Sequence, residues 1–146
     1  MRIPMSSPDL TEAEISAVNH VLATSSLSIG PTLEAFERAL AAYVGTAHAV
    51  GISSGTSGLH LAVIAAGIQA GDEVITSPFS FVASANCVLY ERALPRFVDV
   101  DPRTGNIDPH QIEAAITPRT RAIIPVDAFG QPADMDAIVT VARRHN

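Results

Sequence analysis

Apolar residues recur at two different spacings along the chain, and the change between them separates an N-terminal part from the rest. Up to residue 44 they recur every three or four positions, as they do on one face of an amphipathic helix. From residue 48 onward, short apolar runs alternate with longer segments of helical spacing. This alternation is typical of β-α-β units, in which helices connect parallel strands.

Capping residues mark several of the predicted helices. Thr11 and Glu14 form the pattern of a capping box, Pro31 suits a first helical turn, and Gly45 is a typical helix stop. Asp108 and Asp134 are further N-cap residues. The predicted helices cover residues 12–23, 31–44, 59–66, 79–90 and 109–116, with a last one after residue 134, and the predicted strands cover 48–53, 73–77, 96–100 and 121–126.

Four strands joined by helices predict an α/β fold with a mainly parallel sheet and helices on both faces. Such sheets bind ligands at the carboxyl ends of their strands. The sequence ends directly after a predicted helix, where the alternation would place another strand, so we expect an incomplete domain. We divide the chain into an N-terminal helix and loop, residues 1–30, and this incomplete domain, residues 31–146.

Composition narrows the classes of function. The chain has 146 residues, which suffices for one packed domain, and no apolar run is long enough to span a bilayer. A net charge of −6 argues against nucleic-acid and anionic-membrane partners. The single cysteine, Cys87, fits the reducing cytoplasm. All 9 basic residues are arginines, so these residues alone cannot form a lysine Schiff base with a carbonyl cofactor.

The strongest candidate for a binding site is the SSGTSG motif at residues 53–58, after the first predicted strand. Glycines let the backbone approach a ligand closely, and the amides of residues 55–58 would point out of a helix N-terminus, which favours a phosphate. The alternative is a plain turn that caps the following helix, and the pattern leaves both open. The motif matches neither a Walker loop nor the GxGxxG fingerprint.

Three other sets of residues carry candidate chemistry. Phe79 and Phe81 follow the second predicted strand, where a ring could stack on a flat heterocycle or, alternatively, fill the core. Asp99 and Asp101 could form a metal or acid–base pair, but the PRTG that follows favours a polar turn. Asp127 could bind a substrate or simply face solvent. The histidines have no zinc-ligand spacing, so we predict no metal site and no hydrolase triad.

Several motifs occur together in the order typical of one enzyme family: Gly30-Pro31, the SGT turn, GDEVI, PFSFVAS, FVDVDP and GQPADMDAI. In this combination the chain resembles the sugar aminotransferases of the DegT/DnrJ/StrS type, almost continuously from residue 25 to residue 138. The resemblance implies a fold-type-I enzyme that uses pyridoxal 5′-phosphate (PLP). Such an enzyme transfers an amino group, usually from glutamate, to a nucleotide-linked keto-sugar, and it works as a homodimer.

The resemblance also implies roles for individual residues. Gly55, Thr56 and Ser57 would bind the cofactor phosphate and Phe81 would stack on the pyridine ring, which makes residues 31–146 part of a PLP-binding large domain. The Schiff-base lysine of the family, the acid that pairs with the pyridine nitrogen and the C-terminal domain have no counterpart in the chain. Many members carry His where this chain has Asp127. We therefore predict an N-terminal portion that has no catalytic residue of its own and folds weakly or not at all in isolation.

Two alternatives stay open at the level of the sequence. One is a non-catalytic module that binds a phosphorylated ligand or a partner subunit. The other is a PLP-dependent enzyme of the same fold with another reaction, such as a sugar dehydratase or a desulfurase. The residue at the position of the absent lysine would separate this last class from the aminotransferases.

Overall fold

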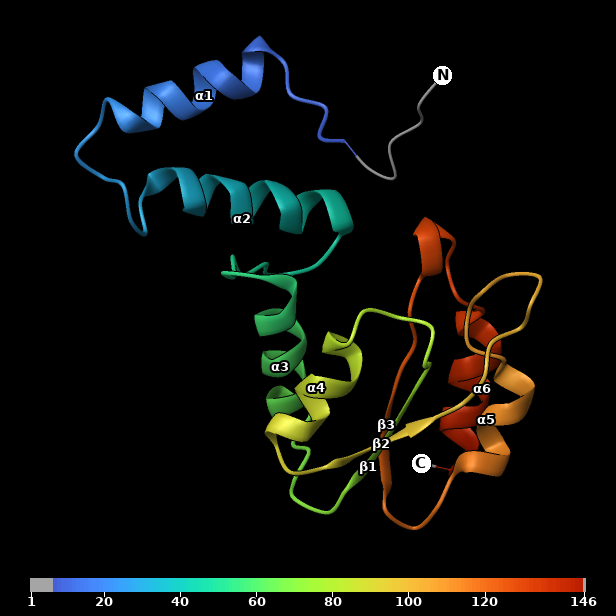
Figure 1. Ribbon diagram of the computed structural model, residues 1–146. Helices are drawn as coiled ribbons and strands as arrows, with labels where there is room; N and C mark the ends of the chain where they lie inside the picture. The colour runs from blue at the N-terminus through green and yellow to red at the C-terminus, as the bar shows by residue number, and fades with distance from the viewer. Residues whose placement is uncertain (1–6, 146) are drawn as a thin grey trace. The chain divides into compact units, whose positions relative to one another are not determined.

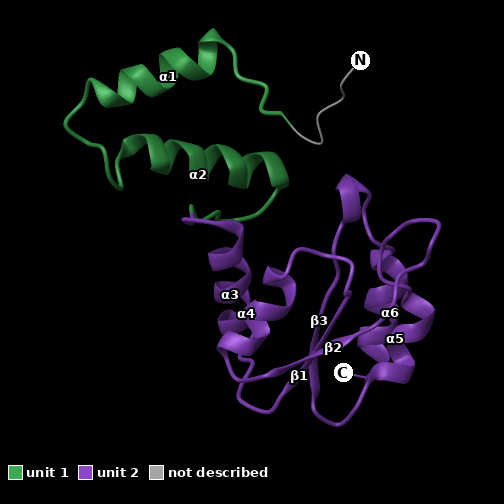
Figure 2. Ribbon diagram, viewed as in Figure 1, with its two compact units in different colours: residues 1–51 green, residues 52–146 purple. Residues whose placement is uncertain are grey.

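The computed structural model describes residues 7–145, and the chain forms two compact units, Met1–Gly51 and Ile52–Asn146 (Figure 2). The sequence predicts a division after residue 30, whereas the structure groups both N-terminal helices in one unit. The amide of Gly51 donates a hydrogen bond to Glu37 Oε1 at 2.7 Å, which ties the end of this unit to the second helix.

The first unit contains the two helices predicted for it, α1 (Glu12–Leu22) and α2 (Pro31–Val44) (Figure 1). Thr11 and Glu14 form the predicted capping box at the start of α1. Gly45 follows α2 in the left-handed conformation, with a φ of 75°, which glycine adopts without steric cost. Local capping signals therefore predict both helices correctly.

The second unit is a three-stranded parallel sheet with strand order β2-β1-β3 and helices on both faces (Figure 1). The predicted fold class is confirmed. In chain order its elements are α3 (Gly55–Ala65), β1 (Glu73–Thr76), α4 (Ala83–Tyr90), β2 (Leu94–Phe97), α5 (Pro109–Ala115), β3 (Thr120–Ile124), the short 3₁₀ helix η1 (Ala128–Gly130) and α6 (Met135–His145).

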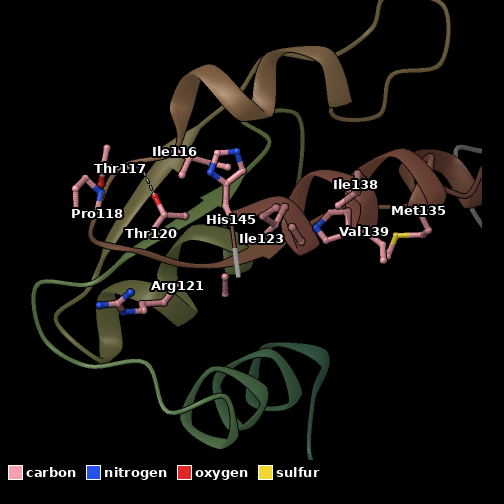
Figure 3. Close-up of a pocket in the computed structure, with 13 residues that line it drawn as sticks. Ile116, Thr117, Pro118, Thr120, Arg121, Ile123, Met135, Ile138, Val139 and His145 are labelled. Atoms are coloured by element: carbon pink, nitrogen blue, oxygen red, sulfur yellow. Dashed lines mark hydrogen bonds between the residues drawn. The ribbon is translucent and has the colours of Figure 1, made fainter.

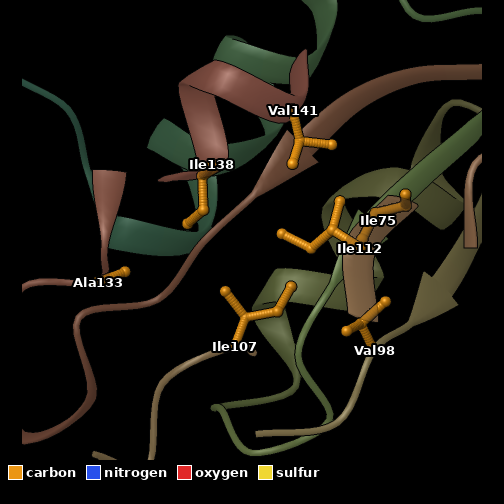
Figure 4. Close-up of a cluster of buried hydrophobic side chains, with 7 residues drawn as sticks. All are labelled: Ile75, Val98, Ile107, Ile112, Ala133, Ile138 and Val141. Carbon is orange, nitrogen blue, oxygen red and sulfur yellow. The ribbon is translucent and has the colours of Figure 1, made fainter. Parts of the chain in front are cut away.

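The central strand β1 is buried along its whole length because helices cover both faces of the sheet. Successive side chains of a strand point to opposite faces, so Val74 and Ile75 belong to different apolar clusters. Val74 packs in the cluster that includes Cys87 of α4. Ile75 packs in the cluster that includes Ile112 of α5 and Ile138 of α6 (Figure 4). These two clusters hold the carboxyl ends of the strands in fixed positions.

The strand predicted at residues 48–53 does not form, and Val50 and Ile52 are 74% and 46% exposed. A strand needs a neighbour to satisfy its backbone amides and carbonyls, and within residues 7–145 no strand pairs with this segment. The apolar pattern indicates a segment suited to burial but carries no information about the pairing partner. The prediction of a fourth strand is therefore wrong for this chain.

Other elements begin or end at different residues from those predicted. β2 lies two residues earlier, because the chain leaves the sheet after it and forms only an isolated antiparallel bridge at Val100. α4 begins at Ala83 rather than at residue 79. Before it, the Ser77 hydroxyl accepts a hydrogen bond from the Phe79 amide at 3.0 Å and holds the chain in a bend. Side-chain hydrogen bonds of this kind compete with helix formation.

Candidate cofactor site

The candidate phosphate site is the amino end of α3, which begins inside the SSGTSG motif. Ser54 is the N-cap residue, and its hydroxyl accepts a hydrogen bond from the Ser57 amide at 3.1 Å. The Ser54 carbonyl accepts one from the Gly58 amide at 3.0 Å. Two of the four amides expected to face a ligand are thus used inside the helix. The amides of Gly55 and Thr56 are the helix-end donors that have no acceptor within α3.

The two glycines of the motif have different surroundings. A Cβ atom at Gly58 would lie 2.3 Å from Ile52 Cδ1, so the end of this 46% exposed side chain would have to shift. A Cβ atom at Gly55 would meet nothing within 4 Å. The space in front of the first helical turn is therefore open, as an approaching anion requires.

Ser57 does not line the cavity at this helix start, and its side chain is hydrogen-bonded inside the motif. Its hydroxyl lies 3.1 Å from that of Ser53 and 3.0 Å from that of Ser54, so the three side chains form one hydrogen-bonded cluster. All three predicted residues, Gly55, Thr56 and Ser57, lie in the first turn of α3.

A cavity of about 530 Å³ lies at this helix start, and its volume is typical of small-molecule sites. It brings together three of the four predicted site residues, Gly55, Thr56 and Phe81, from separate segments of the chain. These segments are the start of α3, the loop into α4 and the carboxyl end of β3. The complete lining is Gly55, Thr56, Leu59, Ser80, Phe81, Ala83, Ser84, Ile124, Pro125 and Val126.

The walls of this cavity are positioned by short polar contacts. The Thr76 hydroxyl donates to the Ile124 carbonyl at 2.9 Å and joins the ends of β1 and β3. The hydroxyls of Ser80 and Ser84 lie 2.6 Å apart. Phe81 is 75% exposed, so it does not fill the core, and its ring is available to a ligand. Of the two interpretations of Phe81, the structure excludes the core one.

Asp127 and Asn106 hold the turn that follows β3. Asp127 Oδ1 accepts a hydrogen bond from the Ala133 amide at 2.9 Å, so this carboxylate organises the loop as well as facing solvent. Asn106 is only 4% exposed; its Oδ1 accepts from the Ala128 amide at 2.8 Å and its Nδ2 donates to the Gln131 carbonyl at 2.9 Å. Nothing in the sequence singles out Asn106, because its bonding partners lie more than twenty residues away.

The predicted polar turn at Asp101 is confirmed. Asp101 Oδ1 accepts from the Arg103 amide at 2.8 Å, and its other oxygen pairs with the Arg103 guanidinium at 2.8 Å. These hydrogen bonds hold the pKa of the Asp101 carboxyl below its usual value. Among residues 7–145 no cluster of three metal-ligating side chains occurs, and no helix there is both long and apolar enough to cross a membrane.

A buried carboxylate marks the opposite edge of the sheet. Glu73, at the start of β1, is 1% exposed and accepts a hydrogen bond from the Thr117 hydroxyl at 2.8 Å. It also pairs with Arg119, and with Arg96 at 3.5 Å. The hydrogen bond from Thr117, with the two guanidinium groups, holds the Glu73 pKa below its ordinary value although burial acts to raise it. Because β1 separates this network from the cofactor cavity, we assign it to the joining of the three strands.

A larger cavity, of about 630 Å³, runs along β3 and α6 (Figure 3). It contains none of the predicted site residues, and most of its lining is apolar. The complete lining is Ile116, Thr117, Pro118, Thr120, Arg121, Ala122, Ile123, Pro125, Met135, Ile138, Val139, Ala142 and His145. The smaller cavity is the candidate site, because a helix N-terminus and the exposed ring of Phe81 face the same space there.

A parallel sheet whose carboxyl edge combines a helix N-terminus with an aromatic side chain is the arrangement of α/β enzymes that bind phosphorylated cofactors. The chain belongs to the DegT/DnrJ/EryC1/StrS aminotransferase family, whose model matches residues 8–146. The resemblance seen in the sequence is thus confirmed, and this family consists of PLP-dependent sugar aminotransferases.

Individual relatives match nearly all of the chain. It is 48% identical over 143 residues to the spore coat polysaccharide biosynthesis protein SpsC of Bacillus subtilis, covering 98% of this chain and 37% of that protein. It is 48% identical over 146 residues to the GDP-perosamine synthase of Caulobacter vibrioides, covering 99% of this chain and 39% of that protein. The crystal structure of NtdA from Bacillus subtilis matches with a TM-score of 0.87 and 40% identity, covering 92% of this chain and 31% of NtdA. The chain therefore spans less than two fifths of the length of each.

PLP is the cofactor of this family, and matching solved structures include PLP- and PMP-bound forms. The residues of the cavity fit part of this group. Two helix-end amides and the position of Thr56 suit a phosphate, and the exposed ring of Phe81 suits a flat pyridine. No lysine is present for the covalent attachment, so these residues fit the phosphate and ring but not the Schiff base.

Proposed function

We propose that this chain forms the phosphate-binding and ring-stacking part of the cofactor site in a PLP-dependent aminotransferase that acts on a nucleotide-linked keto-sugar. Glutamate is the amino donor in this proposal, and the active enzyme is a homodimer. The observation that carries it is the convergence of Gly55, Thr56 and Phe81 on one cavity in a chain that belongs to an aminotransferase family.

Each of these residues has a physical task in the proposal. The amides of Gly55 and Thr56 donate hydrogen bonds to phosphate oxygens, and the positive end of the α3 dipole stabilises the charge. The Thr56 hydroxyl adds a further donor. Phe81 covers one face of the pyridine ring and excludes water from it. Ser57 contributes indirectly, because its cluster with Ser53 and Ser54 keeps the first turn of α3 in place.

When bound, PLP supplies the electron sink that amino transfer requires. In the proposal, the lysine amine and the acid for the pyridine nitrogen are contributed by residues outside these 146. The residues at the start of α3 would hold the phosphate and Phe81 would hold the ring, so together they would orient the cofactor for the reaction.

The names of the relatives support the class of substrate. A GDP-perosamine synthase at 48% identity is an enzyme of nucleotide-sugar metabolism, and SpsC is named for polysaccharide biosynthesis. We place the reaction in the cytoplasm, where the free thiol of Cys87 is stable.

A second candidate, a non-catalytic module that binds a phosphorylated ligand, is favoured by one observation. The helix N-terminus and its cavity offer a phosphate site that requires no covalent contact. Such a module would bind PLP, or another phosphate ester, through Gly55 and Thr56 without forming a covalent bond to it.

The test is a titration of PLP into the complete enzyme that contains this chain, compared with its Thr56→Val variant. Loss of a hydrogen bond to a charged phosphate costs about 1.5–3 kcal/mol, so the affinity should fall about ten- to a hundredfold. Thr140→Val is the matched control, because the Thr140 hydroxyl bonds only the Asp136 carbonyl of its own helix, at 2.7 Å. Equal PLP affinity of the Thr56→Val and wild-type enzymes would contradict the proposed phosphate site.

The two candidates differ in covalent attachment. Borohydride reduction of the PLP-loaded complete enzyme should leave the cofactor covalently bound to a lysine outside the present sequence. Cofactor that dialyses away intact after this treatment would favour the non-catalytic module.

A further inference from the structure

Phe129 combines an unfavourable backbone with almost complete exposure. Its φ of 55° lies in the left-handed region, which is sterically disfavoured for a residue with a bulky side chain. The residue is 94% exposed, so its ring contributes little to the core. Backbone strain of this kind persists where the surrounding structure imposes it, and it is concentrated at ligand-binding positions.

The surrounding structure does impose this conformation. Asn106 bonds the turn on both sides of Phe129, through the Ala128 amide at 2.8 Å and the Gln131 carbonyl at 2.9 Å. Because Asn106 is 4% exposed, these bonds are shielded from competing water. The chain thus uses a buried polar side chain to hold an apolar ring in solvent.

Phe129 is paired with a second aromatic side chain. Its ring centroid lies 5.9 Å from that of Phe79, with an angle of 62° between the ring planes. Phe79 is half exposed, and it rests on a tight turn at Gly105, where an added Cβ atom would lie 3.6 Å from Phe79 Cε1. This edge-to-face contact supports the ring of Phe129, which nevertheless stays 94% exposed.

The pair lies next to the candidate cofactor cavity along the chain. Ser80 and Phe81, which directly follow Phe79, line that cavity, and so does Val126, three residues before Phe129. All of these residues follow the carboxyl ends of the adjacent strands β1 and β3. The aromatic pair and the cavity therefore lie at the same edge of the sheet, where a substrate longer than the cavity could contact both.

We propose that Phe129, supported by Phe79, is the stacking surface for the planar base of the substrate's nucleotide part. The inference rests on the proposed function, in which the sugar approaches the cofactor and the base lies at the rim. Every base has a π-face, so stacking on an apolar ring contributes affinity without selecting one base. The contact is thus independent of which nucleotide the enzyme uses.

The experiment measures binding of GDP, UDP and dTDP to the complete enzyme by calorimetry, with and without PLP, in the wild type, Phe129→Ala and Phe129→Tyr. Base stacking on an aromatic residue is lost in the alanine variant, so the affinity for whichever diphosphate binds should fall about 5- to 100-fold. Phe129→Tyr keeps a ring and should restore the affinity to within about twofold. Pyrophosphate, which has no base, should bind all three proteins equally.

The inference would be overturned if no nucleoside diphosphate bound the wild type, or if Phe129→Ala bound it with wild-type affinity. It would also be overturned if Phe129→Ala weakened pyrophosphate binding by the same factor, or if this variant changed the oligomeric state in sedimentation. The last would assign Phe129 to a subunit interface. PLP occupancy, measured by absorbance in the same samples, reports separately on the proposed function. An enzyme that binds nucleotide through Phe129 but never binds PLP would refute only the cofactor assignment.

Discussion

Replacement of Asn106 by alanine tests whether one buried amide organises the carboxyl edge of the sheet. The substitution removes both hydrogen bonds of the side chain, to the Ala128 amide and to the Gln131 carbonyl. The substitution therefore tests the contribution of these two hydrogen bonds to the turn.

The two lost bonds have unequal costs. Ala128 is 7% exposed, so its amide would remain buried without a partner, which costs about 1–3 kcal/mol. Gln131 is exposed, so water can replace the lost donor at its carbonyl. We therefore expect a local destabilisation of about 1–3 kcal/mol in the turn, close to the cost of a single unpaired buried amide.

Amide hydrogen exchange of residues 127–131 in the complete enzyme measures this local opening. Exchange at the Ala128 amide should accelerate about five- to a hundredfold in Asn106→Ala, since 1.4 kcal/mol corresponds to a factor of about ten. The control is Asn19→Ala, which changes an exposed asparagine of α1 and should leave these rates unchanged. Unaltered protection of Ala128 in Asn106→Ala would refute the assigned role of the buried amide.

Two further predictions concern the ends of β1 and α3. Ser54→Ala removes the N-cap of α3. In denaturant titrations of the complete enzyme without PLP, it should lower the free energy of unfolding by about 0.5–2 kcal/mol. An unchanged midpoint would show that the serine cluster does not cap the helix. The lowered pKa of Glu73 adds stability that is complete above pH 4.5 and is lost as the pH falls through the folded-state pKa. Glu73→Gln should flatten this acid loss in unfolding experiments that compare pH 7 with values below pH 4.5. The control Glu34→Gln changes an exposed carboxylate and should leave the acid loss unchanged. If Glu73→Gln showed the same pH dependence of stability as the wild type, the stabilising role of Glu73 would be excluded.

Local signals predict the helices of the chain and much of its site. The capping box at Thr11 and the stop at Gly45 act within a few residues of chain, and the structure confirms both. Phe81 and Val126 line one cavity because loops that follow parallel strands meet at one edge of a sheet, whereas Gly55 and Thr56 follow a segment that forms no strand. The start of α3 at Gly55 was not predictable, because glycines favour a turn. The helix begins there because Ser54 caps it.

The amino-acid sequence by itself determined the helices, the parallel α/β class, the family and the absence of a lysine among these residues. Only the tertiary structure decided that residues 48–53 lack a pairing partner, that Ser57 turns to its neighbouring serines, and that Asn106 holds Phe129 in solvent. The physical reason is the range of the interactions. Apolar periodicity and caps act within one or two turns of chain, whereas strand pairing and buried side-chain hydrogen bonds join residues tens of positions apart.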